Sequence, residues 1–254
     1  MCGRYASSRR PQDLVEEFEI EDNRVATPLE PDYNVAPTKE VYAVVERPPH
    51  VEESGEQRPP ERQLRVLRWG LVPSWAKDPS IGNRMINARM ETVAEKPAFK
   101  RAFAKRRCLL PADGYFEWYP THQLTKSGKP RKQPFFIRPA DGGVLAMAGL
   151  YEIWRDPTRA DDDPERFRWT CTVLTTEAED AVGHIHDRMP LTVERDRWEQ
   201  WLDPTLADRD DLLGLLVPAA PGRLEAYPVS TAVSNVRNNG PELVEPIPAE
   251  EALE

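Results

Sequence analysis

The stretch at residues 144–154, VLAMAGLYEIW, points to the kind of fold that this chain adopts. Its apolar part, residues 144–150, has the length of a buried β-strand and falls well short of the about 18 residues that a membrane-spanning helix needs. Strand-like runs of the same kind lie on both sides of it. They are residues 41–45, 64–69, 107–111, 135–138, 169–175 and 224–229. We therefore expect β-strands to dominate, and we expect no membrane association.

Helical patterns are fewer and scattered. Residues 12–20 (QDLVEEFEI) space their apolar side chains as one helix face, and Pro11 precedes them at a position typical of a first helical turn. Further short helices are expected at residues 96–105, 195–202 and 210–217. Strands and helices do not alternate regularly as they do in a doubly wound sheet. The prediction is an α+β fold: a single domain with a mixed, mostly antiparallel sheet or barrel-like core and peripheral helices.

The charge of the chain is unevenly distributed. Of 254 residues, 39% are hydrophobic, enough for a sizeable core, and 43 acidic against 34 basic residues give a net charge of −9. A net acidic chain is not typical of nucleic-acid-binding proteins. However, residues 96–107 carry six basic side chains, residues 126–132 carry four, and Arg4, Arg9 and Arg10 form a third group. A basic surface for phosphates is therefore compatible with the net charge, although a solvated helix face would explain residues 96–107 equally well.

The acidic residues gather elsewhere. They are concentrated at residues 52–61, at residues 156–165 and in the C-terminal stretch, where residues 241–254 contain five Glu, three Pro and no basic residue. We expect this C-terminal stretch to be a solvated end.

Three cysteines, Cys2, Cys108 and Cys171, are an odd number without a CxxC pair. This usage favours a reduced, cytoplasmic setting over a disulfide framework, and the first residues (MCGRYASSRRP) lack the apolar segment of a secretory signal. We expect Cys108 and Cys171 to be buried and inert. His184 and His186 lie two residues apart, but no third ligand is evident beyond Asp187, so we expect neither a metal nor another cofactor.

Cys2 offers unusual chemistry. Removal of Met1 by a methionine aminopeptidase would leave a free α-amine and a thiol on adjacent carbons, with pKa values of about 8 and about 8.5 in free peptides. Such a pair can attack an amide as an N-terminal nucleophile. It can also capture an aldehyde, the amine forming a Schiff base and the thiolate closing a thiazolidine ring. The remaining alternative is an accidental cysteine on a frayed terminus.

Short motifs follow Cys2 in a defined order. They are residues 33–38 (YNVAPT), 68–71 (RWGL), 87–92 (NARMET), 108–118 (CLLPADGYFEW), 184–190 (HIHDRMP) and 233–237 (VSNVR). With CGRY at residues 2–5, this set resembles the SRAP family, the SOS response-associated peptidases or abasic-site processing proteins. The resemblance covers residues 2–246 and implies one SRAP-like catalytic domain there, with residues 247–254 as an acidic C-terminal tail.

The resemblance implies a specific reaction. Members of the family bind single-stranded DNA and form a covalent thiazolidine between the N-terminal cysteine and the ring-opened aldehyde of an abasic site, which protects the site during repair. In this sequence Cys2 matches the nucleophile, Glu117 the acid/base carboxylate, His186 the histidine that assists Schiff-base chemistry and sugar ring opening, and Asn87 the residue that orients the cross-link. An abasic-site lyase activity and self-catalysed removal of Met1 belong to the same expectation.

The resemblance also implies a DNA-binding surface on a protein that acts as a monomer and associates with the nucleoid when bound to damaged DNA. The matching positions are Arg4, Arg89, Arg188, Trp69, Trp75, Lys96 and Lys100. Two positions depart from the family pattern: Ser74 replaces a tryptophan that often precedes Trp75, and Pro97 replaces an arginine that contacts DNA in some members. Aromatic residues beside a basic groove would stack on unpaired bases with little dependence on sequence.

The individual residues support these roles without deciding them. If Glu117, between Phe116 and Trp118, is buried, its pKa is raised as a proton donor near pH 7 requires; otherwise it is an outward-facing strand residue. His186 suits a proton shuttle or a structural hydrogen bond, and Asn87 suits a turn or cap as well as a site.

Three functions therefore remain open. The first is a cross-linking enzyme at abasic sites. The second is an amide hydrolase that uses Cys2 as an N-terminal nucleophile and needs an oxyanion hole. The third is a non-catalytic nucleic-acid-binding module.

Overall fold

Strands provide most of the regular structure in the computed structural model, which describes residues 2–47, 50–51, 57–178 and 180–253. They are β1 (Tyr5–Ser7), β2 (Asp22–Asn23), β3 (Asp32–Val35), β4 (Glu40–Arg47), β5 (His50–Val51), β6 (Gln57–Arg58), β7 (Glu61–Trp69), β8 (Asn87–Arg89), β9 (Arg107–Ala112), β10 (Gly114–Leu124), β11 (Pro130–Pro139), β12 (Leu145–Arg155), β13 (Phe167–Glu177), β14 (Arg188–Pro190) and β15 (Leu224–Pro228). The expected dominance of strands is confirmed.

The helices are short. The α-helices are α1 (Pro11–Glu17), α2 (Lys100–Lys105), α3 (Asp180–Gly183), α4 (Trp198–Leu202) and α5 (Arg209–Gly214). Turns of 3-10 helix occur at Pro79–Arg84, Pro164–Arg166, Arg195–Arg197, Thr231–Ser234, Pro241–Val244 and Ala249–Glu251. In the described part of the chain, no helix is both long and apolar enough to cross a membrane.

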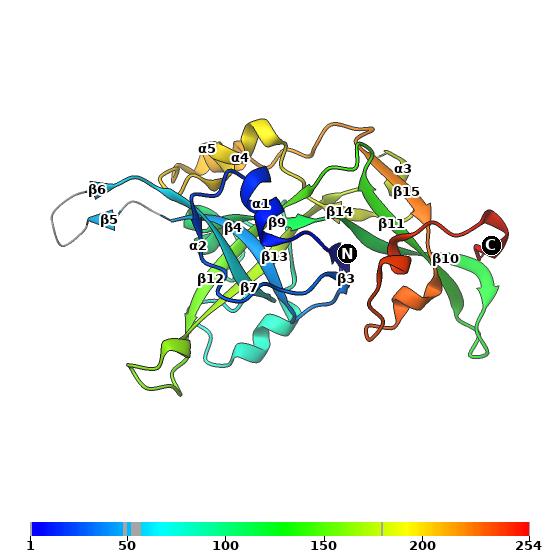
Figure 1. Ribbon diagram of the computed structural model, residues 1–254, viewed down its shortest axis with the longest axis horizontal. Coiled ribbons are helices and arrows are strands. Elements are labelled where there is room, and N and C mark those ends of the chain that lie inside the picture. Colours follow the sequence, from blue (N-terminus) through cyan, green and yellow to red (C-terminus); the bar gives the residue numbers. More distant parts are fainter. Residues whose placement is uncertain (1, 48–49, 52–56, 179, 254) are drawn as a thin grey trace.

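Five strands close into a barrel (Figure 1). β4 pairs antiparallel with β7 and β9, and β12 pairs antiparallel with β9 and β13. The ring closes because β13 also pairs in parallel with β7, through Thr170 opposite Arg68 and Cys171 opposite Trp69. β14, β8 and β2 add to this sheet outside the ring, and β5 pairs with β6. The expected mixed, mostly antiparallel, barrel-like core with peripheral helices is therefore confirmed.

Alternating side chains of the barrel strands build two cores. In β4, Val41, Ala43 and Val45 belong to an interior cluster that also holds Cys108 and Cys171, because successive side chains of a strand point to opposite faces. The residues between them join a second cluster outside the barrel. That cluster includes Tyr42, Val44, Leu64, Leu109, Phe18, Trp198 and Trp201. Both expected buried cysteines are thus confirmed as interior residues, and burial raises the pKa of each thiol.

The helices cover the outer cluster, with bounds that differ from the sequence prediction. α1 begins at Pro11 as expected but ends at Glu17, and Glu19 then takes a positive φ of 53° that breaks the helix. α2 begins only at Lys100 rather than at residue 96. Turns precede it because a proline disfavours helical backbone in the residue before it, here Lys96.

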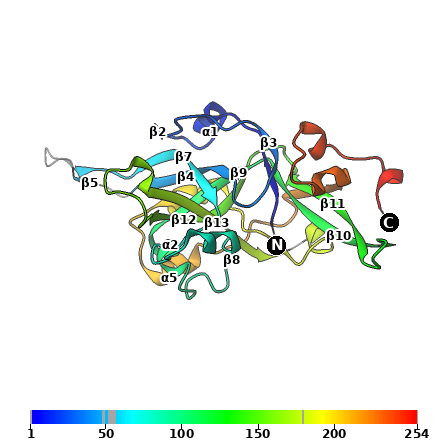
Figure 2. The same cartoon turned by 90° about the horizontal axis from the view of Figure 1, so that it is seen from below.

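A second sheet packs beside the barrel in the order β15-β11-β10-β1-β3, with every pairing antiparallel. Tyr5 and Tyr115 on one face join the cluster of the barrel interior. Phe116 and Phe136 on the other face form a third cluster with residues of the C-terminal region. The start of β1 therefore lies where the barrel meets the smaller sheet, as Figure 1 and Figure 2 show.

The C-terminal stretch is mostly exposed among the described residues, as expected of a solvated end, but it also packs on this second sheet. Leu243 is 1% exposed within the third cluster, and Val229 forms a β-bridge with Pro246. The contacts continue past residue 246, since the backbone N–H of Leu253 donates to Oε1 of Gln133 at 2.9 Å. The charge count missed that a few apolar side chains, spaced along short 3-10 turns, are enough to dock an acidic segment.

Candidate active site

Cys2 lies at the start of the strand that joins the two sheets. Tyr5 pairs with Tyr115, and the N–H of Phe116 donates to the carbonyl oxygen of Arg4 at 2.9 Å. Extending this antiparallel register toward the chain start brings Cys2 beside the part of β10 that carries Glu117. The Cys2 side chain has no exposed surface, and its Sγ approaches the carbonyl oxygen of Arg4 at 3.9 Å. Met1, whose removal the aminothiol chemistry requires, lies outside the described residues.

Asn87 reaches Cys2 from the barrel. Its Nδ2 donates a 2.8 Å hydrogen bond to the carbonyl oxygen of Cys2. Its Oδ1 is buried and accepts no hydrogen bond from any described residue. Buried polar atoms are rarely left unpaired, so this oxygen is an acceptor available to a group that enters the site.

The backbone around Asn87 is fixed from inside the barrel. The indole N–H of Trp69 donates to the carbonyl oxygen of Ile86 at 2.9 Å, and the N–H of Val173 donates to the same oxygen. A close approach of Gly70 and Gly82 lets the 3-10 turn that precedes β8 lie on this wall, because a Cβ on Gly82 would meet the oxygen of Gly70 at 2.5 Å. Asn87 is therefore placed by packing rather than by its own turn.

Glu117 is buried, with 4% exposure, on the central strand β10 of the second sheet. Burial raises the pKa of its carboxyl group, while His186 acts in the opposite direction. The expectation that this glutamate is a buried residue with a raised pKa is confirmed in direction, and the outward-facing alternative is excluded.

His186 faces Glu117 with a defined nitrogen. Its Nε2 lies 3.9 Å from Oε2 of Glu117, and its Nδ1 accepts a 2.9 Å hydrogen bond from the backbone N–H of Arg188. That acceptor role assigns the proton of the neutral ring to Nε2, on the side of Glu117. In the charged ring Nδ1 carries a proton as well, and Oδ1 of Asp187, 2.9 Å away, is the acceptor at hand. The ring thus has partners in both protonation states.

The thiol of Cys2 differs from a thiol in a free peptide. Burial, together with the charge of Glu117, raises its pKa. The free-peptide pKa quoted above therefore does not apply to this folded site. A base that takes up the thiol proton is therefore needed when the sulfur attacks. The Glu117 carboxylate is near enough for its charge to affect the thiol.

Of the seven predicted DNA-binding residues, four side chains are exposed. They are Arg89, Lys96, Lys100 and Trp75. Trp75 is 59% exposed, on a turn held by the hydrogen bond from the Trp154 indole to the carbonyl oxygen of Ala76. Arg4 is half-buried and borders Cys2. These five side chains are therefore accessible, at least in part, to a nucleic acid.

Trp69 and Arg188 are placed differently from the expectation. Trp69 has no exposed surface and packs on Tyr5 with ring centroids 5.2 Å apart, so it supports the wall of the site and cannot stack on a base in this structure. Arg188 is 9% exposed and binds the Glu91 carboxylate with two hydrogen bonds of 2.7 and 3.0 Å. Its charge is compensated, and the pair ties the segment of Asn87 to that of His186.

The basic cluster at residues 96–107 also divides. Lys96, Lys100, Arg101 and Lys105 are exposed. Arg107, in contrast, is buried and donates to backbone carbonyl groups of Trp201 and Phe103; burial lowers its pKa to about 10. The cluster is therefore smaller as a surface than its sequence suggests.

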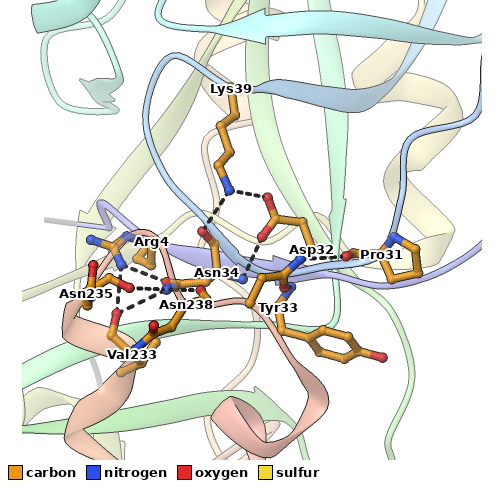
Figure 3. A network of polar contacts seen from close by, with 10 residues as sticks. Arg4, Pro31, Asp32, Tyr33, Asn34, Lys39, Val233, Asn235 and Asn238 are labelled. Carbon is orange, nitrogen blue, oxygen red and sulfur yellow. Dashed lines mark hydrogen bonds and ion pairs between the residues drawn. The ribbon is translucent and has the colours of Figure 1, made fainter.

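Sequence reasoning assigned no role to Asn34, although it noted the motifs at residues 33–38 and 233–237. Asn34 is fully buried and joins these motifs to Arg4 (Figure 3). Trp118 also borders Arg4, whose guanidinium carbon lies 5.6 Å from its ring centroid. The motifs themselves were visible, but a contact between Asn34 and Val233 across the chain has no local signal.

The described residues contain no group of three or more His, Cys, Asp or Glu side chains that could hold a metal ion. The site instead combines a buried thiol, a raised-pKa carboxyl group, a histidine and an amide. This set can move protons and hold a carbonyl-derived group.

Comparisons with known proteins agree with the sequence motifs. The family model described as SOS response associated peptidase (SRAP) matches residues 1–236. The abasic site processing protein YoqW of Bacillus subtilis (strain 168) is 37% identical over 245 residues, which are 96% of this chain and 99% of the relative. YedK of Escherichia coli, with the same description, is 33% identical over 97% of this chain and all of the relative.

More distant similarity extends to vertebrates and to solved structures. The abasic site processing protein HMCES of Xenopus tropicalis is 29% identical over 95% of this chain and 77% of its own length. A crystal structure of a protein from Bacteroides thetaiotaomicron superposes with a TM-score of 0.77, covering 97% of this chain and all of that one, at 23% identity. This last likeness concerns the fold alone.

Proposed function

The chain belongs to the SOS response associated peptidase (SRAP) family, and we propose that it processes abasic sites in single-stranded DNA by linking them covalently to Cys2. Its relatives at 33–37% identity are described as abasic site processing proteins. The observation that carries the proposal is the convergence of Asn87, Glu117 and His186 from separate segments on the first residues of the chain.

The first step is formation of a Schiff base. After Met1 is removed, the α-amine of Cys2 attacks the C1′ aldehyde of the ring-opened sugar. The aldehyde oxygen accepts protons and leaves as water, and the nitrogen of Cys2 forms a C=N bond with C1′. The hydrogen bond from Asn87 to the Cys2 carbonyl fixes the backbone that carries this amine, so the attacking nitrogen is held in place.

The second step is ring closure. The sulfur of Cys2 adds to C1′ of the Schiff base, the thiol proton leaves the sulfur, and the nitrogen gains a proton, which gives a thiazolidine without any oxidant. Because burial raises the thiol pKa, this proton must be taken up as the S–C bond forms. The Glu117 carboxylate is the proton acceptor that we assign to this step.

Glu117 and His186 also serve the sugar. An abasic deoxyribose is mostly a closed hemiacetal, and opening it requires a proton on the ring oxygen and removal of one from the C1′ hydroxyl. A buried carboxyl group with a raised pKa can donate the first proton, and it can be recharged through Nε2 of His186, 3.9 Å away.

DNA binding precedes this chemistry in the proposal. Arg4 borders Cys2, and Arg89, Lys96 and Lys100 add exposed positive charge for backbone phosphates. Trp75 offers an exposed ring to an unpaired base. The same Schiff base can also undergo β-elimination, so we assign a lyase side reaction to the enzyme when ring closure is slow.

The proposal is tested with an oligonucleotide that carries one abasic site, followed by boiling and denaturing electrophoresis. Wild-type protein gives a shifted band that survives boiling, and Cys2→Ala gives none. Cys2→Ser keeps the amine but replaces the thiol, so it gives a band only after borohydride reduction. Cys171→Ala removes an equally buried thiol from the barrel wall and behaves as wild type.

The same assay separates the other two functions. A nucleic-acid-binding module shows native-gel binding that survives Cys2→Ala and no boiling-resistant band. An N-terminal-nucleophile hydrolase releases product from an amide substrate and needs no abasic site. Either result in place of the shifted band contradicts the cross-linking proposal.

A further inference from the structure

Asn34 makes four side-chain hydrogen bonds at the edge of the site (Figure 3). Its Oδ1 accepts from Nη1 of Arg4 at 2.7 Å. Its Nδ2 lies 3.2, 3.0 and 2.9 Å from the carbonyl oxygens of Val233, Asn235 and Asn238. The side chain has no exposed surface, and its amide oxygen and amide nitrogen together join the start of the chain to this C-terminal segment.

Arg4 is held at both ends by these contacts. Nη1 also donates to the carbonyl oxygen of Val233 at 2.9 Å, and the guanidinium lies over the ring of Trp118. At the backbone, the Arg4 carbonyl accepts from Phe116 and lies 3.9 Å from Sγ of Cys2. Arg4 is therefore oriented directly beside the reacting residue.

The partner that orients Arg4 is neutral. No described carboxylate lies within ion-pair distance of its guanidinium. Asp32, two residues before Asn34, is bound by Lys39 at 2.6 Å and by the N–H of Asn34 at 2.8 Å. Arg188, the other buried or half-buried arginine that sequence reasoning assigned to DNA, is instead neutralised by Glu91. An amide holds an arginine without cancelling its charge, whereas a carboxylate does both.

We propose that Asn34 is a positioning residue that fixes the Arg4 guanidinium with its charge uncompensated, so that Arg4 binds a backbone phosphate next to the abasic nucleotide. This inference rests on the proposed function for the identity of the ligand. It predicts that Asn34 affects DNA binding through Arg4. It also predicts that Asn34→Asp weakens DNA binding more than the loss of the amide's hydrogen bonds alone would explain.

The experiment measures non-covalent binding of undamaged single-stranded DNA over a series of salt concentrations, in a Cys2→Ala background that cannot cross-link. The variants are Arg4→Ala, Asn34→Ala, Asn34→Asp and the two double variants that include Arg4→Ala. Asn239→Ala is the matched control. It breaks the contacts of the same C-terminal segment with Tyr33 and Pro31 and does not touch Arg4.

Log K falls linearly with the logarithm of the salt concentration, and losing one phosphate contact makes this line less steep by about 0.7 for single strands. We expect that decrease for Arg4→Ala and for Asn34→Asp, in which the new carboxylate neutralises Arg4. Asn34→Ala leaves the charge but frees the side chain, so it weakens binding about two- to tenfold. Neither substitution has a further effect in the Arg4→Ala background, and Asn239→Ala keeps the wild-type slope.

Contrary results are equally specific. A wild-type slope for Asn34→Asp, or effects that add to those of Arg4→Ala, would show that Asn34 does not act through Arg4. Thermal unfolding of each variant identifies any that is not folded at the binding temperature. If Asn34→Asp is unfolded, the same test uses Asn34→Ala and the double variant Asn34→Ala with Arg4→Ala, whose binding should equal that of Arg4→Ala alone.

The outcome is independent of the covalent chemistry. If the wild-type protein never cross-links but the slopes behave as stated, the proposed reaction fails and the role of Asn34 stands. If cross-linking occurs and the slopes do not respond, only the role of Asn34 fails.

Discussion

The side-chain amide of Asn87 holds the carbonyl group of Cys2 with a 2.8 Å hydrogen bond across 85 positions of sequence. This contact is one that ties the barrel to Cys2, the residue that carries the reacting atoms in our proposal. Chain termini usually fray, and a nucleophile on a fraying end would lose most of the advantage of a prearranged site.

Replacing Asn87 by Ala should therefore slow cross-linking without weakening DNA binding. We expect the rate at saturating abasic DNA to fall about ten- to hundredfold, the size of effect produced by small misplacement of reacting groups. Single-turnover kinetics measure the rate, and native gels measure the affinity. Asn83→Ala is the control, since Asn83 is an exposed neighbour whose Oδ1 accepts a hydrogen bond from the side chain of Arg68. Equal losses of rate and affinity would contradict the role of Asn87.

Glu117→Gln should remove proton transfer while keeping the shape of the site. General acid–base groups contribute about 10²–10⁴-fold, and we expect a loss of rate in that range with nearly unchanged DNA affinity. The rate loss of Glu117→Gln is measured with two substrates, a closed-ring abasic site, which requires sugar ring opening, and a small free aldehyde, which does not. A smaller defect with the free aldehyde assigns part of the role of Glu117 to sugar ring opening, and an unchanged rate with abasic DNA contradicts the assignment.

The same substitution should stabilise the fold at high pH. Burial raises the pKa of Glu117 above its ordinary 4.5, so the folded chain holds this proton in a pH window where the unfolded chain has lost it. Stability therefore falls as pH rises through that window, and Glu117→Gln escapes the loss. Thermal unfolding should show a higher midpoint for the variant at pH 8, by about 2–4 °C for each kcal/mol by which the ionised carboxylate destabilises the fold, and this pH-dependent difference should disappear below pH 4.5. A lower midpoint at pH 8 would contradict the direction of the shift.

The exposed lysines at the start of α2 should carry part of the DNA affinity. Reversing Lys96 and Lys100 to Glu is expected to weaken binding of single-stranded DNA and to flatten its salt dependence. Reversing Lys126 and Lys129, exposed residues at the turn between β10 and β11, is the control with the same change in net charge. If both double variants weaken binding equally, the effect reflects net charge and not a groove at Lys96 and Lys100.

Much of the fold could be predicted from local patterns. The apolar run at residues 41–45 predicts a strand, which the structure confirms within β4. For Glu117, its aromatic neighbours made burial with a raised pKa one of two alternatives, and the structure selects that one. These features depend on the residue and its immediate neighbours, which is the information that a single sequence carries most directly.

What could not be predicted depends on long-range pairing. The barrel closes through a parallel contact between Cys171 and Trp69, and no local pattern specifies that register. The ion pair between Arg188 and Glu91 joins segments far apart in the sequence, and no local pattern predicts it. Asn34 hydrogen-bonds to both Arg4 and Val233, and no local pattern in the sequence predicts that these distant segments meet.

Mass spectrometry of the N-terminal peptide after exposure to abasic single-stranded DNA tests the central claim most directly. The prediction is a peptide that begins at Cys2, lacks Met1 and carries the mass of the sugar joined with loss of one water, resistant to borohydride because the ring is closed. An adduct on a chain that retains Met1, an adduct on another residue, or an unmodified Cys2 in protein that has formed a boiling-resistant complex would contradict it.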